Sequence, residues 1–313
     1  MFEDSMVTTD SLNSMNSPNS PYEPAEMDGD SRAVSVCMLK GGVGKSTIAV
    51  NLARHLAQRH DVLMIDLDPN GHGSVGLGFD DHYRNTDEGI GDVLFDEADP
   101  TSLVYNTDYE FDLLPSSEDL EQVEREIVVG DVFQPSALLK REVVEPLLGD
   151  EYDYIVIDSP AYRSRLTDNA LVATANLILP LAPGNEAISG LERTIERQIS
   201  PLRQHIDVDV LALVPNKLNG RIDQQTQDRR LLERLNSHES LQNRVPNFAR
   251  ITDWEAVDTG DIKPAPGIRD RTNITKAYGE RKPLLDYDPD CDQLKCFDEL
   301  AHIVAAGEVV RHG

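Results

Sequence analysis

The sequence has few aromatic residues, no long apolar run and few cysteines. Aromatic residues make up 5% of the 313 positions, with a single tryptophan, so the core must be built mainly from aliphatic side chains. No apolar run approaches the ~18 residues of a membrane-spanning helix, which argues against an integral membrane protein. The three cysteines form no CxxC pair and cannot all join in disulfides with one another, which favours a reducing cytoplasmic compartment.

Positive charge is also scarce. The chain has 56 acidic residues against 29 lysines and arginines, a formal net charge of −27, and only eight of the basic residues are lysines. Such a surface repels both nucleic acid and other copies of itself in dilute buffer. At ~1 M salt the Debye length falls to about 3 Å and the long-range repulsion largely disappears. We therefore hypothesise a cytosolic protein of a salt-accumulating halophile, with an acidic protein of an ordinary cytosol as the alternative.

Two regions differ in composition. Residues 1–31 are rich in Ser, Asn, Pro and acids and are predicted to be a disordered acidic tail, whereas residues 32–313 are predicted to form one domain. Within this domain, apolar runs typical of buried strands alternate with helical patterns. The strands are expected at 33–39, 62–66, 111–115, 154–158, 177–182 and 208–214, and the helices at 47–60, 118–128, 136–148, 165–175, 186–205, 223–236 and 292–307. This order predicts an α/β fold with a mostly parallel, twisted sheet and helices on both faces. Residues 237–270 show the least pattern.

A glycine-rich segment lies between the first expected strand and the first expected helix. Residues 40–47 read KGGVGKST, and this position is the one that a phosphate-binding loop requires. Successive backbone N–H groups of such a loop converge on phosphate oxygens, and the helix N-terminus adds a partial positive charge. The residues predicted to form this cradle are Gly41, Gly42, Val43 and Gly44.

Three side chains complete the predicted phosphate site. Lys45 is placed to bridge the β- and γ-phosphates, Ser46 to ligate Mg²⁺ and Thr47 to reach the α-phosphate. The sequence therefore predicts a P-loop NTPase. It departs from the general pattern in having Leu39 where a glycine is expected and a second lysine at Lys40.

This KGGVGKST form resembles the deviant Walker A motif of the ParA/MinD family of dimeric ATPases, and the chain is most similar to the ParA/Soj partition branch. In that family the extra lysine reaches across a dimer interface to the partner's nucleotide. The resemblance implies that Lys40 is a catalytic group acting in trans, that ATP and Mg²⁺ are the cofactors, and that ATP binding produces a homodimer.

Two further segments resemble the family's acidic motifs. In VLMIDLDPNGHGS (62–74), the resemblance implies that Asp68 orients or activates the attacking water and that Asp66 supports the Mg²⁺ shell. The alternative is that one of these aspartates only caps the following turn. In YDYIVIDSP (152–160), Asp158 closes an apolar strand as a Walker B acid does, which predicts a carboxylate that binds Mg²⁺ through a water.

The segment LVPNKLNGR (213–221) resembles the part of the family that reads the base. Asn216 corresponds to an asparagine that hydrogen-bonds adenine, since an amide offers both a donor and an acceptor. An ordinary turn is the alternative for Asn216. Arg221 falls close to an arginine that partition ATPases use for DNA contact.

Residues 268–289 resemble a late segment of the partition branch and carry the densest run of basic residues in the chain. By this resemblance Arg269, Arg271 and Lys276 are candidates for contacts with DNA phosphates that show no sequence preference. Local ion pairs with the abundant acids are the alternative. Each phosphate contact also steepens the loss of affinity with salt, so DNA binding in a salty cytosol needs many contacts or a cooperative dimer.

Taken together, these resemblances imply a ParA-type switch for chromosome or plasmid partitioning. ATP would join two subunits into a dimer that binds non-specific DNA at the nucleoid, and a ParB-like centromere-binding partner would stimulate hydrolysis. One alternative is a MinD-like membrane-associated ATPase, but the expected basic amphipathic C-terminal helix is missing, and membrane contact is not expected. The other is a regulator without significant turnover, against which the presence of Lys40, Asp68 and Asp158 argues.

The charge balance leads to a first prediction. Dialysis from molar KCl into low-salt buffer should unfold the protein, because the repulsion among its excess acids is then no longer screened. Circular dichroism and intrinsic fluorescence, followed over a series of KCl concentrations, measure this loss. Full stability in low salt would contradict the halophile hypothesis.

Overall fold

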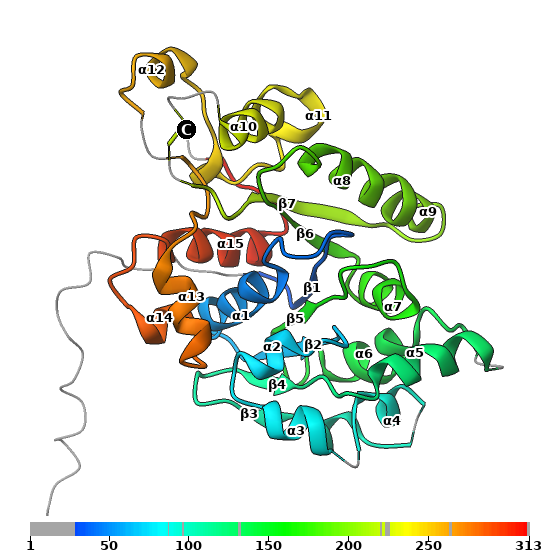
Figure 1. Cartoon of the computed structure of the whole chain (residues 1–313). Coiled ribbons are helices and arrows are strands. Elements are labelled where there is room, and N and C mark those ends of the chain that lie inside the picture. The colour runs from blue at the N-terminus through cyan, green and yellow to red at the C-terminus, as the bar shows by residue number, and fades with distance from the viewer. Residues whose placement is uncertain are drawn as a thin grey trace, which may run out of the picture.

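The computed structural model describes residues 29–311 except 87, 96, 131–132, 220, 223–225 and 263–264. All but the last three residues of the predicted tail 1–31 lie outside the described residues. A seven-stranded sheet organises the structure, in the order β3-β4-β2-β5-β1-β6-β7 (Figure 1). The strands are β1 Arg32–Val36, β2 Val62–Asp66, β3 Tyr105–Asn106, β4 Asp112–Leu114, β5 Tyr154–Asp158, β6 Asn176–Leu181 and β7 Asp209–Pro215.

Neighbouring strands are parallel everywhere except at β3, which pairs antiparallel with β4 at one edge. The mostly parallel α/β sheet predicted from the sequence is confirmed. The antiparallel edge was not predicted, because two residues are too short to show an alternating pattern. Strands β2 and β5 are buried along their whole length, as their continuous apolar sequences require.

Helices cover both faces of the sheet (Figure 1). The helices that follow strands in the first half are α1 Lys45–Leu56, α2 His72–Val75, α3 Asp80–Asn85, α4 Ile90–Leu94, α5 Leu120–Val129, α6 Glu145–Leu147 and α7 Arg165–Thr174. Those in the second half are α8 Ala187–Thr194, α9 Ser200–Leu202, α10 Gln227–Ser237, α11 Glu239–Gln242, α12 Trp254–Asp258, α13 Thr272–Gly279, α14 Leu284–Tyr287 and α15 Leu294–Ala306. No helix of the described part of the chain is both long and apolar enough to cross a bilayer.

Two expected helices are less regular than their sequences predict. The helix expected at 136–148 contains a π-helical stretch at Lys140–Val144, and the one expected at 186–205 contains another at Ile195–Ile199. In both cases a proline, Pro146 or Pro201, is the second residue of the α-helical turn that follows. Because proline has no backbone N–H, it cannot donate the hydrogen bond that a regular α-helix requires at that position. The weakly patterned region 237–270 holds only the short helices α11 and α12 and a single 3₁₀ turn among its described residues.

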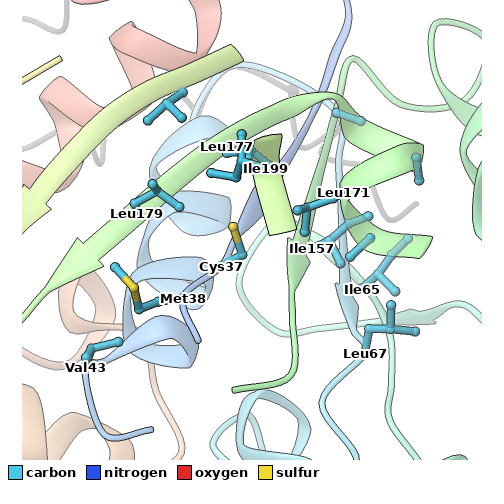
Figure 2. Packing of buried hydrophobic residues seen from close by; sticks show 14 of the residues in the cluster. Cys37, Met38, Val43, Ile65, Leu67, Ile157, Leu171, Leu177, Leu179 and Ile199 are labelled. Carbon is cyan, nitrogen blue, oxygen red and sulfur yellow. The ribbon is translucent and has the colours of Figure 1, made fainter. Parts of the chain in front are cut away.

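The core is divided between the two faces of the sheet. On one face, Val34 and Val36 of β1 meet α1 and α15. On the other, Ala33 and Cys37 contribute to a second cluster, because successive side chains of a strand point to opposite faces. Figure 2 shows part of this second cluster. In it, Cys37 and Met38 lie beside side chains of the neighbouring strands and of Ile199, the last residue of the π-helical stretch Ile195–Ile199. Both layers are almost entirely aliphatic, as the composition predicts.

The packing of α1 against α15 leads to a second prediction. Phe297 of α15 is fully buried, and its ring centroid lies 5.7 Å from that of His55 in α1. Phe297→Ala should lower the free energy of unfolding by about 3–5 kcal/mol, through lost burial and the cavity left behind. Denaturant unfolding in molar KCl measures this. Phe133→Ala is the matched control, since Phe133 is 75% exposed, and an equal loss in both variants would contradict the role of this contact.

Candidate functional site

The predicted phosphate loop lies between β1 and α1, at the edge of the sheet where the parallel strands end. Gly42 and Gly44 have φ values of 73° and 90°, a left-handed conformation that favours glycine. A Cβ added at Gly41 or Gly42 would meet nothing within 4 Å, so these glycines border open space. Helix α1 begins at Lys45, directly after the loop, and no side chain caps its first turn. The free N–H groups of that turn can therefore bind an anion.

Asp158 is a buried carboxylate at this site that lacks hydrogen-bond partners in the described part of the chain. It ends β5, is fully buried, and neither of its carboxylate oxygens has a hydrogen-bond partner among the described residues. Burial raises the pKa of Asp158 well above its usual range, and the charge of Asp66 adds to this, whereas Lys45 and the Ser46 hydroxyl oppose it. A buried carboxylate in this situation fits a nearby cation, since an uncompensated buried charge is costly.

Within the described residues, no group of three or more His, Cys, Asp or Glu could hold a metal ion by itself. This agrees with Mg²⁺, which is usually held by one or two carboxylates together with substrate phosphates and waters. Ser46 lies close enough to Asp158 to lower its pKa, so the two residues are brought together as predicted and fit the ion.

Asp66 lies next to Asp158 in the register of β2 with β5. Its Oδ2 accepts hydrogen bonds from the backbone N–H of Ser74 at 2.7 Å and from the Ser74 hydroxyl at 2.8 Å, and its Oδ1 accepts one from the N–H of Asp68. Burial raises the pKa of Asp66 to about 6, although the Ser74 hydrogen bonds lower it. Asp66 therefore holds the loop that follows β2 and lies beside Asp158, and its support of the Mg²⁺ shell remains a prediction.

Asp68 is buried at the start of the same loop. Its Oδ1 accepts hydrogen bonds from the backbone N–H and the side-chain amide of Asn70, at 3.0 and 2.8 Å. Asp68 thus caps the turn, which was the alternative role considered for this pair of aspartates. Its second oxygen makes no hydrogen bond to any described residue, and it remains available for a water.

Lys40 precedes the loop, and its side chain runs along α8. Its Cδ lies 3.8 Å from the position of a Cβ at Gly190, and its Nζ lies 4.0 Å from that of a Cβ at Gly184. Among the described residues the ammonium group of Lys40 has no ion-pair or hydrogen-bond partner. Lys45, by contrast, is buried close enough to Asp158 to affect its pKa. The side chain of Lys45 therefore lies near Asp158, whereas that of Lys40 lies along α8.

Asn216 follows β7 and contacts the phosphate loop directly. Its side-chain amide donates a 2.8 Å hydrogen bond to the carbonyl of Val43, and its own N–H bonds to the carbonyl of Leu181. A Cβ at Gly44 would collide with this amide, which is a second reason for glycine there. In this structure Asn216 clamps the loop with one N–H of its amide, and its role in adenine recognition remains a prediction.

Comparison with known proteins agrees with this site. A family model described as "AAA domain" matches residues 31–210, more than half of the chain. The chromosome partitioning protein ParA of Caulobacter vibrioides is 31% identical over 284 residues, which cover 89% of this chain and 94% of that protein. The chain belongs to the ParA/MinD family of P-loop ATPases.

Other relatives extend this result. The sporulation initiation inhibitor protein Soj of Bacillus subtilis is 27% identical, over 88% of this chain and 98% of Soj. Two uncharacterised Pseudomonas putida proteins are 36% identical over 168 residues, and the chain spans only 62% of their length.

Solved structures share the fold. Cobyrinic acid a,c-diamide synthase of Mycobacterium smegmatis, solved with a bound ATP analogue and magnesium, has a TM-score of 0.59 at 28% identity, covering 67% of this chain and 83% of that one. The ATP complex of a Cyanothece McdA variant has a TM-score of 0.71 at 20% identity, covering 91% and 100%. ATP and Mg²⁺ are the cofactors that the family and the residues of this site fit.

A cavity of about 310 Å³ opens beside the loop of this ParA/MinD family member. Its walls come from α1, the end of β7 and α13, and are formed by Thr47, Asn216, Lys217, Arg269, Asp270, Ile274, Thr275 and Tyr278. Sequence reasoning missed Lys217, Asp270 and Tyr278. The only signal for Lys217 was its position after Asn216, whereas α13 reaches the site through tertiary packing alone.

The basic residues predicted to contact DNA differ in whether an acidic side chain already pairs with them. Arg269 and Arg271 both form ion pairs with Asp292, the latter at 2.7 Å, so these arginines follow the alternative of local ion pairs. Lys276 is exposed on α13 without a partner among the described residues. The side chain of Arg221 is exposed and lies between segments outside the described residues. Lys276 is therefore the candidate whose charge is most available.

The buried carboxylate leads to a third prediction. Asp158→Asn should raise the free energy of unfolding by about 1–3 kcal/mol at neutral pH without nucleotide or Mg²⁺, because it removes a buried charge that Lys45 offsets only in part and that accepts no hydrogen bond from the described residues. Because the folded-state pKa of Asp158 is raised, the wild-type carboxyl costs stability as the pH rises and is tolerated once protonated. The advantage of the variant should therefore shrink as the pH falls.

Denaturant unfolding at several pH values, in constant salt, measures this difference. Asp150→Asn is the control, because Asp150 is an exposed aspartate. A destabilised Asp158→Asn at neutral pH would show that the carboxylate is already compensated.

Proposed function

We propose that the chain is a ParA-type partition ATPase, in which ATP binding joins two subunits and hydrolysis separates them. The observation that carries the proposal is the buried carboxylate of Asp158, with both oxygens unbonded among the described residues, beside Lys45 and Ser46 at the head of α1. The ATP-analogue and magnesium complex of the M. smegmatis relative and the partition function named for the Caulobacter relative support it.

Each group of the site has a part in this reaction. The N–H groups of the loop and the ammonium of Lys45 bind the phosphates, and Ser46 and Asp158 hold Mg²⁺. Mg²⁺ held there would supply positive charge for the phosphates. Asp68 holds the attacking water with its second oxygen and fixes its own orientation through Asn70. Asp66 positions the loop that carries Asp68.

Lys40 supplies the dependence on a second subunit. Its ammonium, unpaired among the described residues, lies along α8 and is not part of the phosphate cradle of its own chain. In a dimer it would reach the partner's phosphates and stabilise the charge that develops on the transferred group. Hydrolysis would then require the dimer, which is what a switch needs.

The dimer is proposed to bind non-specific DNA at the nucleoid and to move a chromosome or plasmid as its cargo, with a ParB-like protein as the regulator. Lys276, exposed on α13 and unpaired within the described part of the chain, is the most available cation for phosphate contacts. A membrane role is less well supported, because α15 buries its apolar side chains against the sheet and α1. It has no apolar face left for a bilayer.

The fourth prediction tests this proposal. Lys40→Ala should lower ATP hydrolysis by about a thousandfold and abolish the ATP-dependent dimer, because the charge supplied in trans is lost. Phosphate release measures the first effect and light scattering in molar KCl the second. Retardation of non-specific DNA with ATP should occur for the wild type and be lost in Lys40→Ala.

Lys295→Ala, at an exposed lysine of α15, is the control and should behave as the wild type. Normal turnover in Lys40→Ala would reject the trans mechanism. A wild type that binds no ATP in the presence of Mg²⁺ would reject the proposed function altogether.

A further inference from the structure

A tyrosine of α13 packs on a glycine at the end of α2. A Cβ added at Gly76 would meet Cε2 of Tyr278 at 2.5 Å and Cδ2 at 2.8 Å, and its third neighbour would be the carbonyl oxygen of His72 at 2.9 Å. Gly76 has a φ of −66°, which any residue can adopt. The backbone conformation therefore does not require glycine here, whereas the space taken by the ring of Tyr278 does.

Helix α2 belongs to the loop that fixes the two aspartates after β2. Ser74 of α2 donates hydrogen bonds to Asp66 from its N–H at 2.7 Å and from its hydroxyl at 2.8 Å. The Ser74 hydroxyl also accepts one from the N–H of Ser116, and the Ser116 hydroxyl donates one to the carbonyl of Asp68 at 2.8 Å. A shift of α2 would therefore move the groups that hold both aspartates.

Tyr278 is also a wall of the cavity beside the phosphate loop. Its side chain lines both that cavity of about 310 Å³ and a narrow one of about 20 Å³ that reaches Gly76, and it shares this position with Thr47 and Ile274. Because Thr47 is predicted to reach the α-phosphate, the nucleoside attached to that phosphate would enter the larger cavity. Aromatic rings of proteins stack well on nucleic-acid bases. The ring of Tyr278 can therefore contact both the nucleoside and α2.

The ring of Tyr278, and not its hydroxyl, makes the contact with α2. Both atoms nearest to Gly76 are ring carbons, and the hydroxyl forms no hydrogen bond with any described residue. Burial raises the pKa of Tyr278, and the charge of Asp66 adds to this, so the side chain lies within electrostatic reach of that carboxylate. Phenylalanine could therefore replace this tyrosine, whereas alanine would remove the contact.

We propose that Tyr278 is a positioning residue that couples the presence of a nucleoside to the placement of Asp68. The nucleoside holds the ring against Gly76, the ring keeps α2 in place, and the hydrogen bonds of α2 keep Asp68 oriented toward the attacking water. The contact between Tyr278 and Gly76 is independent of the proposed ATPase function, whereas its effect on hydrolysis rests on that function.

Steady-state ATP hydrolysis in molar KCl with Mg²⁺ tests the effect on the reaction. Tyr278→Ala should lower kcat by about tenfold at saturating ATP, because a small displacement of a catalytic group is costly. Tyr278→Phe should restore kcat to near the wild-type value. The control is Glu280→Ala, at an exposed residue directly after α13, which should turn over as the wild type.

Two kinetic results would overturn the positioning role. A rise in KM with kcat unchanged in Tyr278→Ala would leave the tyrosine as a wall of the cavity only. An equal loss of kcat in Tyr278→Phe would assign the effect to the hydroxyl, which makes no contact with α2.

Hydrogen exchange gives a readout that does not depend on turnover. A non-hydrolysable ATP analogue with Mg²⁺ should slow amide exchange in residues 72–78 of the wild type and of Tyr278→Phe, and slow it less in Tyr278→Ala. Equal protection in the three proteins, or none in any, would mean that the nucleoside does not act on α2 through this ring, and would overturn the proposal.

The contact itself is tested by denaturant unfolding without nucleotide. Gly76→Ala should lower the unfolding midpoint more in the wild type than in Tyr278→Ala, because the added methyl group no longer meets the ring, while its contact with the His72 carbonyl is the same in both. Equal losses would reject the contact. Unequal losses in a protein that binds and hydrolyses no ATP would reject the proposed function and leave the contact in place.

Discussion

The site depends on a carboxylate that is buried without a hydrogen-bonding partner among the described residues. Asp158 sits at the end of a fully buried strand, in register with a second buried aspartate on β2. Lys45 and Ser46 relieve this charge only in part, so a cation bound between Ser46 and Asp158 would be stabilised by it. The same arrangement costs stability when no ligand is bound, which links nucleotide binding to folding.

Asp66, Lys45 and Lys40 surround the charge of Asp158 in different ways. The oxygens of Asp66 accept hydrogen bonds from Ser74 and Asp68, so this carboxylate holds the loop that follows β2. Lys45 lies inside the site, whereas Lys40 lies along α8, outside it. One lysine can therefore serve its own subunit and the other a neighbouring one. This separation is the observation on which the proposed dependence on a dimer rests.

The sequence by itself determined the parallel sheet, its central strands, the phosphate loop and the acids that end β2 and β5. It could do so because buried strands and glycine-rich turns have local patterns, and because parallel strands place their carboxyl ends at one edge. Only the tertiary structure decided that Arg269 and Arg271 converge on Asp292, that Asn216 clamps Val43, and that α13 closes the cavity beside Thr47. These contacts join residues far apart in the chain, and no local pattern encodes which acid or carbonyl a polar side chain will meet.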